Sequence, residues 1–496
     1  MLGVRPLLGN ARTVIARNTI RRCADAVLVV VTVPALAMLC CGSGTASADR
    51  PFLDPALLPA SAPAAPPEPT EQRNACVPVS PMPDGPAVPA SMSTLDFESV
   101  WPLTRGAGQL VAVIDTGVSP HPRLPGLRPG GDYVFTGDGL SDCDAHGTLV
   151  AGLIAASSVP GSGFSGGAPA AQILSIRQSS NQFQRQRRGD EPEASSVDNA
   201  SGYGNVMTMA MAIRTAADLG ATVINISEVA CVPSGAGVAD GPLGAAIDYA
   251  ARVKDVVVVA AAGNVGGQSA CRSQNPLPDP ADPSADLWDR VSTVATPAWF
   301  DDRVLTVGSV APDGRPAEFT LAGPWVDVAA PGTSMTSLSP TDTGLTDGTV
   351  DNQGGIAPIQ GTSFSAPLVS ALAALVRSYR PELTAAQVVQ RIESTAHFPA
   401  EGWNPLVGHG VVDPLAAVTA EVAGERDLAP AEPIAMQAPA PPTPPDLRPR
   451  NVAVIGAGAV GVVLVAGLAL SIPFRRRFDT HSVGNSAASG SGPTPS

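Results

Sequence analysis

The chain has 496 residues, of which 44% are hydrophobic, so it is long enough for two or three domains around a sizeable core. Glycine and proline number 50 and 51, but they gather in segments and form no collagen-like period. The net charge of −14 argues against a nucleic-acid partner, because no basic face is available to neutralise phosphates.

The first 48 residues have the pattern of a secretory signal peptide. Basic residues come first, between Arg5 and Arg22, and an apolar run follows over 26–39. Ala46-Ser47-Ala48 then gives the small-residue pattern of a cleavage site, although an uncleaved membrane anchor is the alternative. Residues 49–92 form a Pro-rich N-terminal extension without periodic apolar residues, so this segment cannot build a core of its own.

Residues 93–424 alternate short β-branched runs with helical patterns. This alternation predicts an α/β fold with a mostly parallel central sheet and helices on both faces. The predicted strands are 110–114, 172–176, 222–226, 256–260, 304–307 and 325–328. The predicted helices are 147–156, 205–219, 242–252, 363–377 and 384–394, the last with a capping box between Thr384 and Gln387. The polar segment 178–203 is predicted to be a long exposed loop.

The C-terminal part predicts a linker and a membrane anchor. Residues 425–450 are rich in proline, which favours a stiff, extended linker. The segment 451–473 holds an uncharged apolar stretch of transmembrane length, and Arg475-Arg476-Arg477 follows it. Such an arginine cluster stays cytoplasmic, so we expect a cytoplasmic tail over 474–496 and a preceding domain outside the cytoplasmic membrane.

A dinucleotide-binding fingerprint also occurs within the same apolar stretch. Gly456, Gly458 and Gly461 match G-x-G-x-x-G. The fingerprint requires a folded βαβ unit and an acidic residue about twenty positions on, and the chain instead runs into the arginines. We therefore prefer the membrane helix.

Four polar residues stand where predicted elements begin or end. Asp115 closes a strand, Asn264 follows another, His146 lies in the first turn of a helix, and Ser363 precedes an apolar helix. A helix N-terminus favours negative charge, which suits a serine that generates an oxyanion, as at Ser363. The same field disfavours a positively charged histidine, so a purely structural reason for His146 at this position is weak. Asp115, Asn264 and Ser363 each have a plainer alternative as a helix cap or turn residue.

Together the four residues match the needs of acyl transfer. A serine hydroxyl is a weak nucleophile, so it requires a base within hydrogen-bond reach and a carboxylate that orients the base. An amide such as that of Asn264 can donate to the developing oxyanion. Residues 163–167 also fit the hydrolase elbow G-x-S-x-G, but that elbow must follow a strand and this one follows a helix.

Six sequence blocks resemble those of the subtilisin-like serine proteases, in the order of that family and over about 110–415. The blocks are VAVIDTG, HGTLVAG, GAPAAQILSIR, VINIS, AAGN and GTSFSAP. The resemblance implies a subtilisin-like fold in which Asp115 orients His146, the general base and acid. It further implies that Ser363 is the nucleophile and that Asn264, with the Ser363 backbone N–H, forms the oxyanion hole.

The resemblance also assigns substrate-binding positions. Ser227 matches the strand that pairs with substrate backbone in this family, and Gly263 is expected to bind substrate beside it. Glu228-Val229 departs from the Leu-Gly that the family commonly has here, so a side chain is expected to narrow the specificity pocket. We expect neither a metal site nor a cofactor.

Among these proteases the arrangement is similar to the mycosins, membrane-anchored enzymes associated with actinobacterial type VII secretion. Four cysteines remain beyond the signal peptide and leave three connectivities open. Of these we predict Cys76–Cys143 and Cys231–Cys271, the first of which ties the extension to the catalytic domain. The resemblance implies a single-pass, extracytoplasmic serine endopeptidase acting on protein substrates in a type VII secretion membrane complex. The alternative is a structural subunit of that complex with secondary protease activity.

Overall fold

The structure is a computed structural model, and it describes residues 50–186, 202–237, 239–266, 271–282, 285–351 and 353–422, together with positions 459, 462, 463 and 466. The chain divides into two units, Met1–Glu425 and Arg426–Ser496. The predicted signal peptide, linker and tail lie outside the described residues, and the predicted membrane helix is covered at four positions only. Within the described part of the chain, no helix has both the length and the apolar character needed to cross a membrane.

A seven-stranded sheet forms the centre of the first unit, and every pair of neighbouring strands in it is parallel. In spatial order its strands are β12 (Val328–Pro331), β11 (Leu305–Val310), β9 (Val257–Ala261), β7 (Val223–Ile226), β3 (Leu110–Asp115), β5 (Gln172–Arg177) and β4 (Leu127–Asp132). The apolar strands β3, β7 and β9 are buried along their whole length, as strands covered on both faces must be. The predicted α/β class is confirmed.

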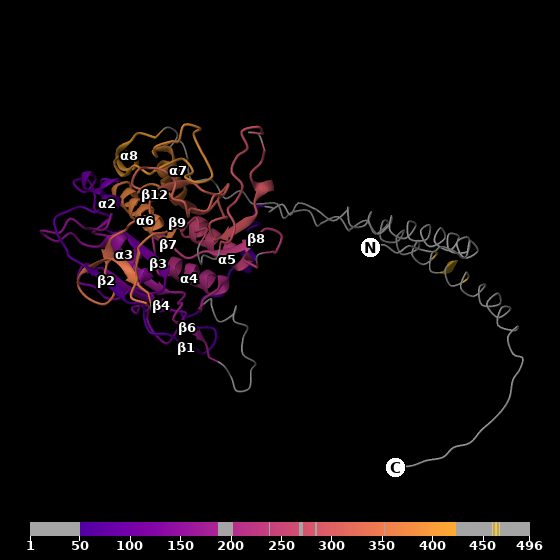
Figure 1. The fold of residues 1–496 in the computed structure, drawn as a ribbon, viewed down its shortest axis with the longest axis horizontal. Helices are drawn as coiled ribbons and strands as arrows, with labels where there is room; N and C mark the ends of the chain where they lie inside the picture. The colour runs from indigo at the N-terminus through magenta and orange to yellow at the C-terminus, as the bar shows by residue number, and fades with distance from the viewer. Residues whose placement is uncertain are drawn as a thin grey trace, which may run out of the picture. The chain divides into compact units, whose positions relative to one another are not determined.

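Helices cover both faces of this sheet (Figure 1). Successive side chains of a strand point to opposite faces, so β3 contributes to two separate cores. Val111 and Val113 pack in the core with α3 (His146–Ala155) and α6 (Thr362–Tyr379). Ala112 and Ile114 pack in the other core, with α4 (Val206–Asp218) and α5 (Gly241–Asp248).

Smaller elements complete the unit. They are α2 (Ala90–Ser93), α7 (Ala385–Ser394), α8 (Pro414–Thr419), η1 (Pro55–Leu57), η2 (Phe97–Ser99), η3 (Tyr249–Val253) and η4 (Trp288–Arg290). The predicted capping box of α7 is confirmed, because Thr384 accepts a hydrogen bond from the Gln387 backbone and donates its own N–H to the Gln387 side chain. Five further strands pair outside the central sheet: β8 (Ala230–Pro233) with β10 (Thr293–Thr296), and β13 (Ser337–Leu338) and β15 (Ile356–Pro358) with β14 (Leu345–Val350).

Several predicted boundaries were wrong, among them the end of the strand predicted at 304–307, which runs to Val310, and two others are informative. The strand predicted at 325–328 begins only at Val328, and Trp325 is instead a fully buried core residue whose ring centroid lies 5.4 Å from that of Trp288. The hydrophobic signal at Trp325 therefore came from side-chain packing and not from strand pairing. The helix predicted over 242–252 is α-helical to Asp248 and continues as the π-helical turn η3.

The N-terminal extension adds strands to the rest of the first unit. Its β1 (Thr70–Gln72) pairs antiparallel with β6 (Phe183–Arg185), and its β2 (Val79–Met82) pairs antiparallel with β14. The segment containing β6 was predicted to be exposed, but Gln178, Ser180 and Phe183 are buried. That prediction is wrong for this part, because the extension and the loop cover each other.

Candidate active site

The candidate site lies where the order of strands changes direction. From β3 the chain proceeds to β4 and β5 on one side of the sheet and then crosses to β7 on the other side. In parallel sheets such a switch point opens a crevice at the carboxyl ends of the strands. Asp115 is the last residue of β3, Ser227 and Glu228 follow β7, and Asn264 follows β9. The sheet therefore gathers polar residues from distant parts of the chain at one edge.

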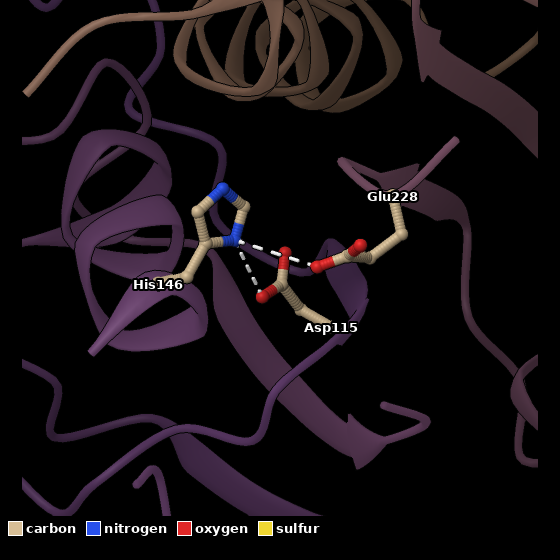
Figure 2. A group of neighbouring side chains, drawn as sticks. All are labelled: Asp115, His146 and Glu228. Atoms are coloured by element: carbon tan, nitrogen blue, oxygen red, sulfur yellow. Dashed lines mark hydrogen bonds and ion pairs between the residues drawn. The ribbon is translucent and has the colours of Figure 1, made fainter. Parts of the chain in front are cut away.

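Asp115 and His146 form a hydrogen-bonded pair. His146 begins α3, and its Nδ1 lies 2.8 Å from Oδ1 of Asp115. A carboxylate can only accept, so Nδ1 carries the proton and Nε2 is the basic nitrogen of the neutral ring. Asp115 is fully buried, whereas 24% of the His146 side chain is exposed. Figure 2 shows Nε2 pointing away from the carboxylates.

Gly147 explains how α3 can approach Asp115 so closely. A Cβ atom at this position would lie 2.0 Å from the Gly117 carbonyl oxygen and 3.1 Å from Asp115 Oδ1. The Gly147 backbone instead donates a hydrogen bond of 2.9 Å to the Thr116 hydroxyl. The glycine next to His146 thus has a steric function in assembling the pair.

Asp142 connects the end of β3 to the first turn of α3 through hydrogen bonds, and it was not among the residues predicted from the sequence. Its Oδ1 accepts from the Thr116 hydroxyl at 2.9 Å, and its Oδ2 accepts from the Thr148 backbone and hydroxyl at 2.8 and 2.7 Å. Burial raises the pKa of Asp142 to about 6, against the hydrogen bonds from Thr148 and Thr116. The available signal for Asp142 in the sequence was the pair Thr116 and Thr148, in the DTG and HGT motifs. A threonine hydroxyl near each catalytic candidate requires a hydrogen-bond partner.

Ser363 is the second residue of α6, and 8% of it is exposed. The next residue, Phe364, packs against the ring of His146 with centroids 5.1 Å apart, which brings the start of α6 to the Asp115–His146 pair. The Ser363 carbonyl accepts a hydrogen bond of 2.8 Å from the Ser227 hydroxyl. Pro367 has no N–H to donate to that carbonyl, so Ser227 takes the place of the missing helical partner.

Asn264 is oriented from the same helix. Its Oδ1 accepts from the Thr362 backbone at 2.9 Å and from the Thr362 hydroxyl at 3.1 Å. The Nδ2 group lies beside Gly361, where an added Cβ would be 3.3 Å away. Gly263 donates its N–H to the Thr362 hydroxyl at 3.1 Å, and its carbonyl accepts from Leu321 at 3.0 Å. Both backbone groups of Gly263 are therefore engaged inside the protein.

Glu228 lies close to the Asp115–His146 pair. Its Oε1 is 4.0 Å from His146 Nδ1, and the donor atoms of Asp115, His146 and Glu228 all lie within 4.8 Å of one another (Figure 2). Two carboxylates and an imidazole can attract a divalent cation, but the 2.8 Å hydrogen bond occupies Nδ1 with a proton. The observed geometry is that of an acid–base group.

The electrostatics of this group favour a charged histidine. Burial lowers the pKa of His146, but Asp115, through charge and hydrogen bond, and then Glu228 and Asp142 raise it to about 10. For Glu228, burial raises the pKa and the charge of Asp115 adds to the rise, while His146 opposes it. The imidazolium is thus the form that its surroundings stabilise.

Two disulfides flank the site. The structure joins Cys76 to Cys143, three residues before His146, with Cα atoms 4.4 Å apart. It also joins Cys231 in β8 to Cys271, with Cα atoms 5.0 Å apart. The serine of the competing G-x-S-x-G pattern, Ser165, lies in a loop beyond α3 and donates its hydroxyl to the Ala156 carbonyl, so it has no elbow geometry.

A parallel sheet with an Asp–His pair at its switch point and a serine at a nearby helix N-terminus defines a class of hydrolases. The sequence profile of the Subtilase family matches residues 106–410, so the chain belongs to this family of serine endopeptidases. Mycosin-4 of Mycobacterium tuberculosis is 51% identical over 456 residues, which cover 89% of this chain and 95% of that protein. Mycosin-3 of the same organism is 44% identical, covering 87% and 94%. Within the subtilases the chain is therefore one of the mycosins.

Solved structures agree with this assignment. The crystal structure of MycP1 from Mycobacterium smegmatis is 43% identical with a TM-score of 0.68, covering 75% of this chain and 96% of that chain. A chain in the periplasmic assembly of the ESX-5 inner membrane complex is 46% identical with a TM-score of 0.70, covering 80% of this chain and all of its own length.

Proposed function

We propose that this subtilase is a membrane-anchored, extracytoplasmic serine endopeptidase associated with type VII secretion, in which Asp115, His146 and Ser363 form the catalytic triad. Its substrates are proteins, and the reaction requires no cofactor. The observation that carries the assignment of the residues is the 2.8 Å bond between Asp115 and His146, whose ring packs against the residue next to Ser363.

In the proposed mechanism, acylation uses His146 as the base and Ser363 as the nucleophile. Nε2 of His146 removes the proton from the Ser363 hydroxyl while the serine oxygen attacks the scissile carbonyl. The oxyanion receives hydrogen bonds from Nδ2 of Asn264 and from the Ser363 backbone N–H, at the positive end of α6. The Asp115 carboxylate stabilises the imidazolium that forms.

Acylation is completed by proton transfer to the leaving group, and deacylation then uses the same residues with water. The imidazolium donates its proton to the leaving amine, which departs and leaves an acyl-enzyme on Ser363. In deacylation a water molecule attacks the acyl carbonyl while Nε2 of His146 takes its proton, and the imidazolium then returns this proton to the Ser363 oxygen as the carboxylic acid product leaves. We propose that the substrate backbone pairs with the segment that begins at Ser227 and that the substrate contacts Gly263. The tie between the Ser227 hydroxyl and the Ser363 carbonyl supports a fixed distance between this segment and the nucleophile.

The cellular setting is inferred from relatives and from sequence. Chains similar to this one occur in structures described as the ESX-5 inner membrane complex and its periplasmic assembly. The predicted signal peptide over 1–48 and membrane helix over 451–473 support a single-pass protein whose catalytic domain lies outside the cytoplasmic membrane. The same relatives favour the second candidate, a structural subunit of such a complex with secondary protease activity.

The triad is tested with a fluorophosphonate probe, which reacts with activated serines. We expect the full-length protein to be labelled, the Ser363→Ala variant to lose labelling, and the Ser165→Ala variant to keep it. Labelling that persists in Ser363→Ala, or that disappears in Ser165→Ala, would contradict the assignment of the nucleophile.

The two candidate roles are separated in the producing organism. A Ser363→Ala strain that loses secretion as completely as a deletion strain indicates that proteolysis is the primary role. If the Ser363→Ala strain secretes normally and only the deletion stops secretion, the structural role is primary.

A further inference from the structure

Glu228 reaches the catalytic histidine because of the strand register. In the sheet, Ile114 of β3 lies opposite Ile226 of β7, so the chain beyond β7 emerges next to Asp115. The Glu228 carboxylate is thereby directed at Nδ1 of His146, the same nitrogen that is bonded to Asp115, as Figure 2 shows. About one third of the Glu228 side chain is exposed, so the charge is accessible to solvent and lies against the site.

We propose that Glu228 is a second carboxylate partner of His146, which stabilises the charged ring and so sets the pH above which this histidine can act as a base. The inference deepens the proposed function and rests on the assignment of His146 as the general base. Glu228 is a positioning residue in this sense, because it acts on the reaction through His146.

The neighbouring carboxylates raise the pKa values of both His146 and Glu228. Asp115 and Asp142 raise the pKa of His146 along with Glu228, and the charges of Asp115 and Asp144 raise the pKa of Glu228. The hydroxyl of Ser179 donates to Glu228, which favours the carboxylate form. On the side of α6, His146 contacts the uncharged ring of Phe364. The charge that distinguishes Glu228 from a neutral isostere therefore acts on both members of the pair, Asp115 and His146.

A charge at this position has two opposite effects on the reaction. In the free enzyme it keeps the ring protonated to a higher pH, so fewer molecules hold a histidine able to accept the proton of Ser363. In the transition state it stabilises the imidazolium that has received this proton. Its removal should extend activity to lower pH and reduce the maximal rate.

The test compares the pH dependence of fluorophosphonate labelling in the full-length wild type and in Glu228→Gln. We expect the midpoint of the labelling rate to fall by about 0.5–1 pH unit, as for the loss of a partly exposed charge 4.0 Å away. The rate at the alkaline plateau should decrease by about 2- to 5-fold. Glu228→Asp, which keeps the charge, should have a midpoint nearer to the wild type, and Glu98→Gln, a control at an exposed carboxylate, should not change it.

An independent measurement follows the ring itself. The titration of His146 is recorded by NMR of protein labelled at histidine carbons, in the Ser363→Ala background, with His146→Ala to assign the signal. A lower titration midpoint of His146 in Glu228→Gln supports the inference. This holds even if the fluorophosphonate probe does not react with the wild type, because the absence of that reaction would contradict only the proposed function. Unchanged midpoints in both experiments, with labelling still lost in Ser363→Ala, would overturn the inference and leave the proposed function intact.

Discussion

At the Ser363 carbonyl, a hydrogen bond from another element replaces one that the helix cannot make. Pro367 stands four residues further on and lacks an N–H, and the Ser227 hydroxyl donates in its place at 2.8 Å. Asn225 donates to that hydroxyl at 2.9 Å and accepts from Ser370 at 2.8 Å, which extends the tie between β7 and α6. These contacts fix where Ser363, the proposed nucleophile, stands relative to the proposed substrate-binding segment.

Asn264→Ala is expected to lower kcat by about 10²–10³-fold with a small change in KM, because an oxyanion-hole donor acts mainly in the transition state. Steady-state kinetics on a cleaved peptide measure this effect. Asn264→Ala also removes the Asn264 side-chain oxygen that accepts hydrogen bonds from Thr362. The control is therefore Thr362→Ala, which loses the Thr362 hydroxyl but keeps the Asn264 side-chain amide. A comparable loss of kcat in both variants would assign the effect to helix anchoring.

At the scale of elements, α7 shows how packing changes acidity. Glu393 of α7 interacts electrostatically with Asp327, which precedes β12. The Asp327 carboxylate also accepts a hydrogen bond of 2.6 Å from the Thr306 backbone N–H. Burial raises the pKa of Glu393 to about 7, and burial followed by the charge of Glu393 raises the pKa of Asp327. The two carboxyl groups are therefore more easily protonated in the folded chain than in the unfolded chain.

Glu393→Gln is expected to raise the melting temperature at pH 8 and to leave it almost unchanged at pH 4.5. A carboxyl group with a raised folded pKa contributes its full stability below its unfolded pKa, and this contribution is lost as the pH rises through about 7. The neutral isostere removes that loss. Thermal unfolding at the two pH values tests the sign, and equal changes at both would contradict it.

At the scale of the whole molecule, the N-terminal extension is built into the catalytic unit. It contributes β1 and β2 to pairings with β6 and β14, and Cys76 links it to Cys143 beside the candidate site. A segment that lacks a core of its own thus becomes ordered by adding strands to existing edges. This arrangement also covers strand edges that would otherwise be open to pairing.

Replacing Cys76 and Cys143 together by serine is expected to reduce the free energy of unfolding by roughly 2–4 kcal/mol, the usual contribution of a disulfide. Denaturant unfolding measures the change, and limited proteolysis should find the extension more readily cut. The matched control replaces Cys231 and Cys271, which should destabilise the protein without exposing the extension. An extension that stays equally protected would show that strand pairing alone holds it.

The sequence by itself determined the parallel sheet, most helices and the four candidates Asp115, His146, Asn264 and Ser363. Strand and helix patterns are local, and the carboxyl ends of parallel strands necessarily meet at one edge, so residues at those ends could be placed without a structure. Only the tertiary structure decided three contacts: the hydrogen bonds of Asp142 to Thr116 and Thr148, the approach of Glu228 to His146, and the pairing of β1 with β6. These contacts depend on strand register and on loop paths between residues far apart in the chain, which local patterns do not specify.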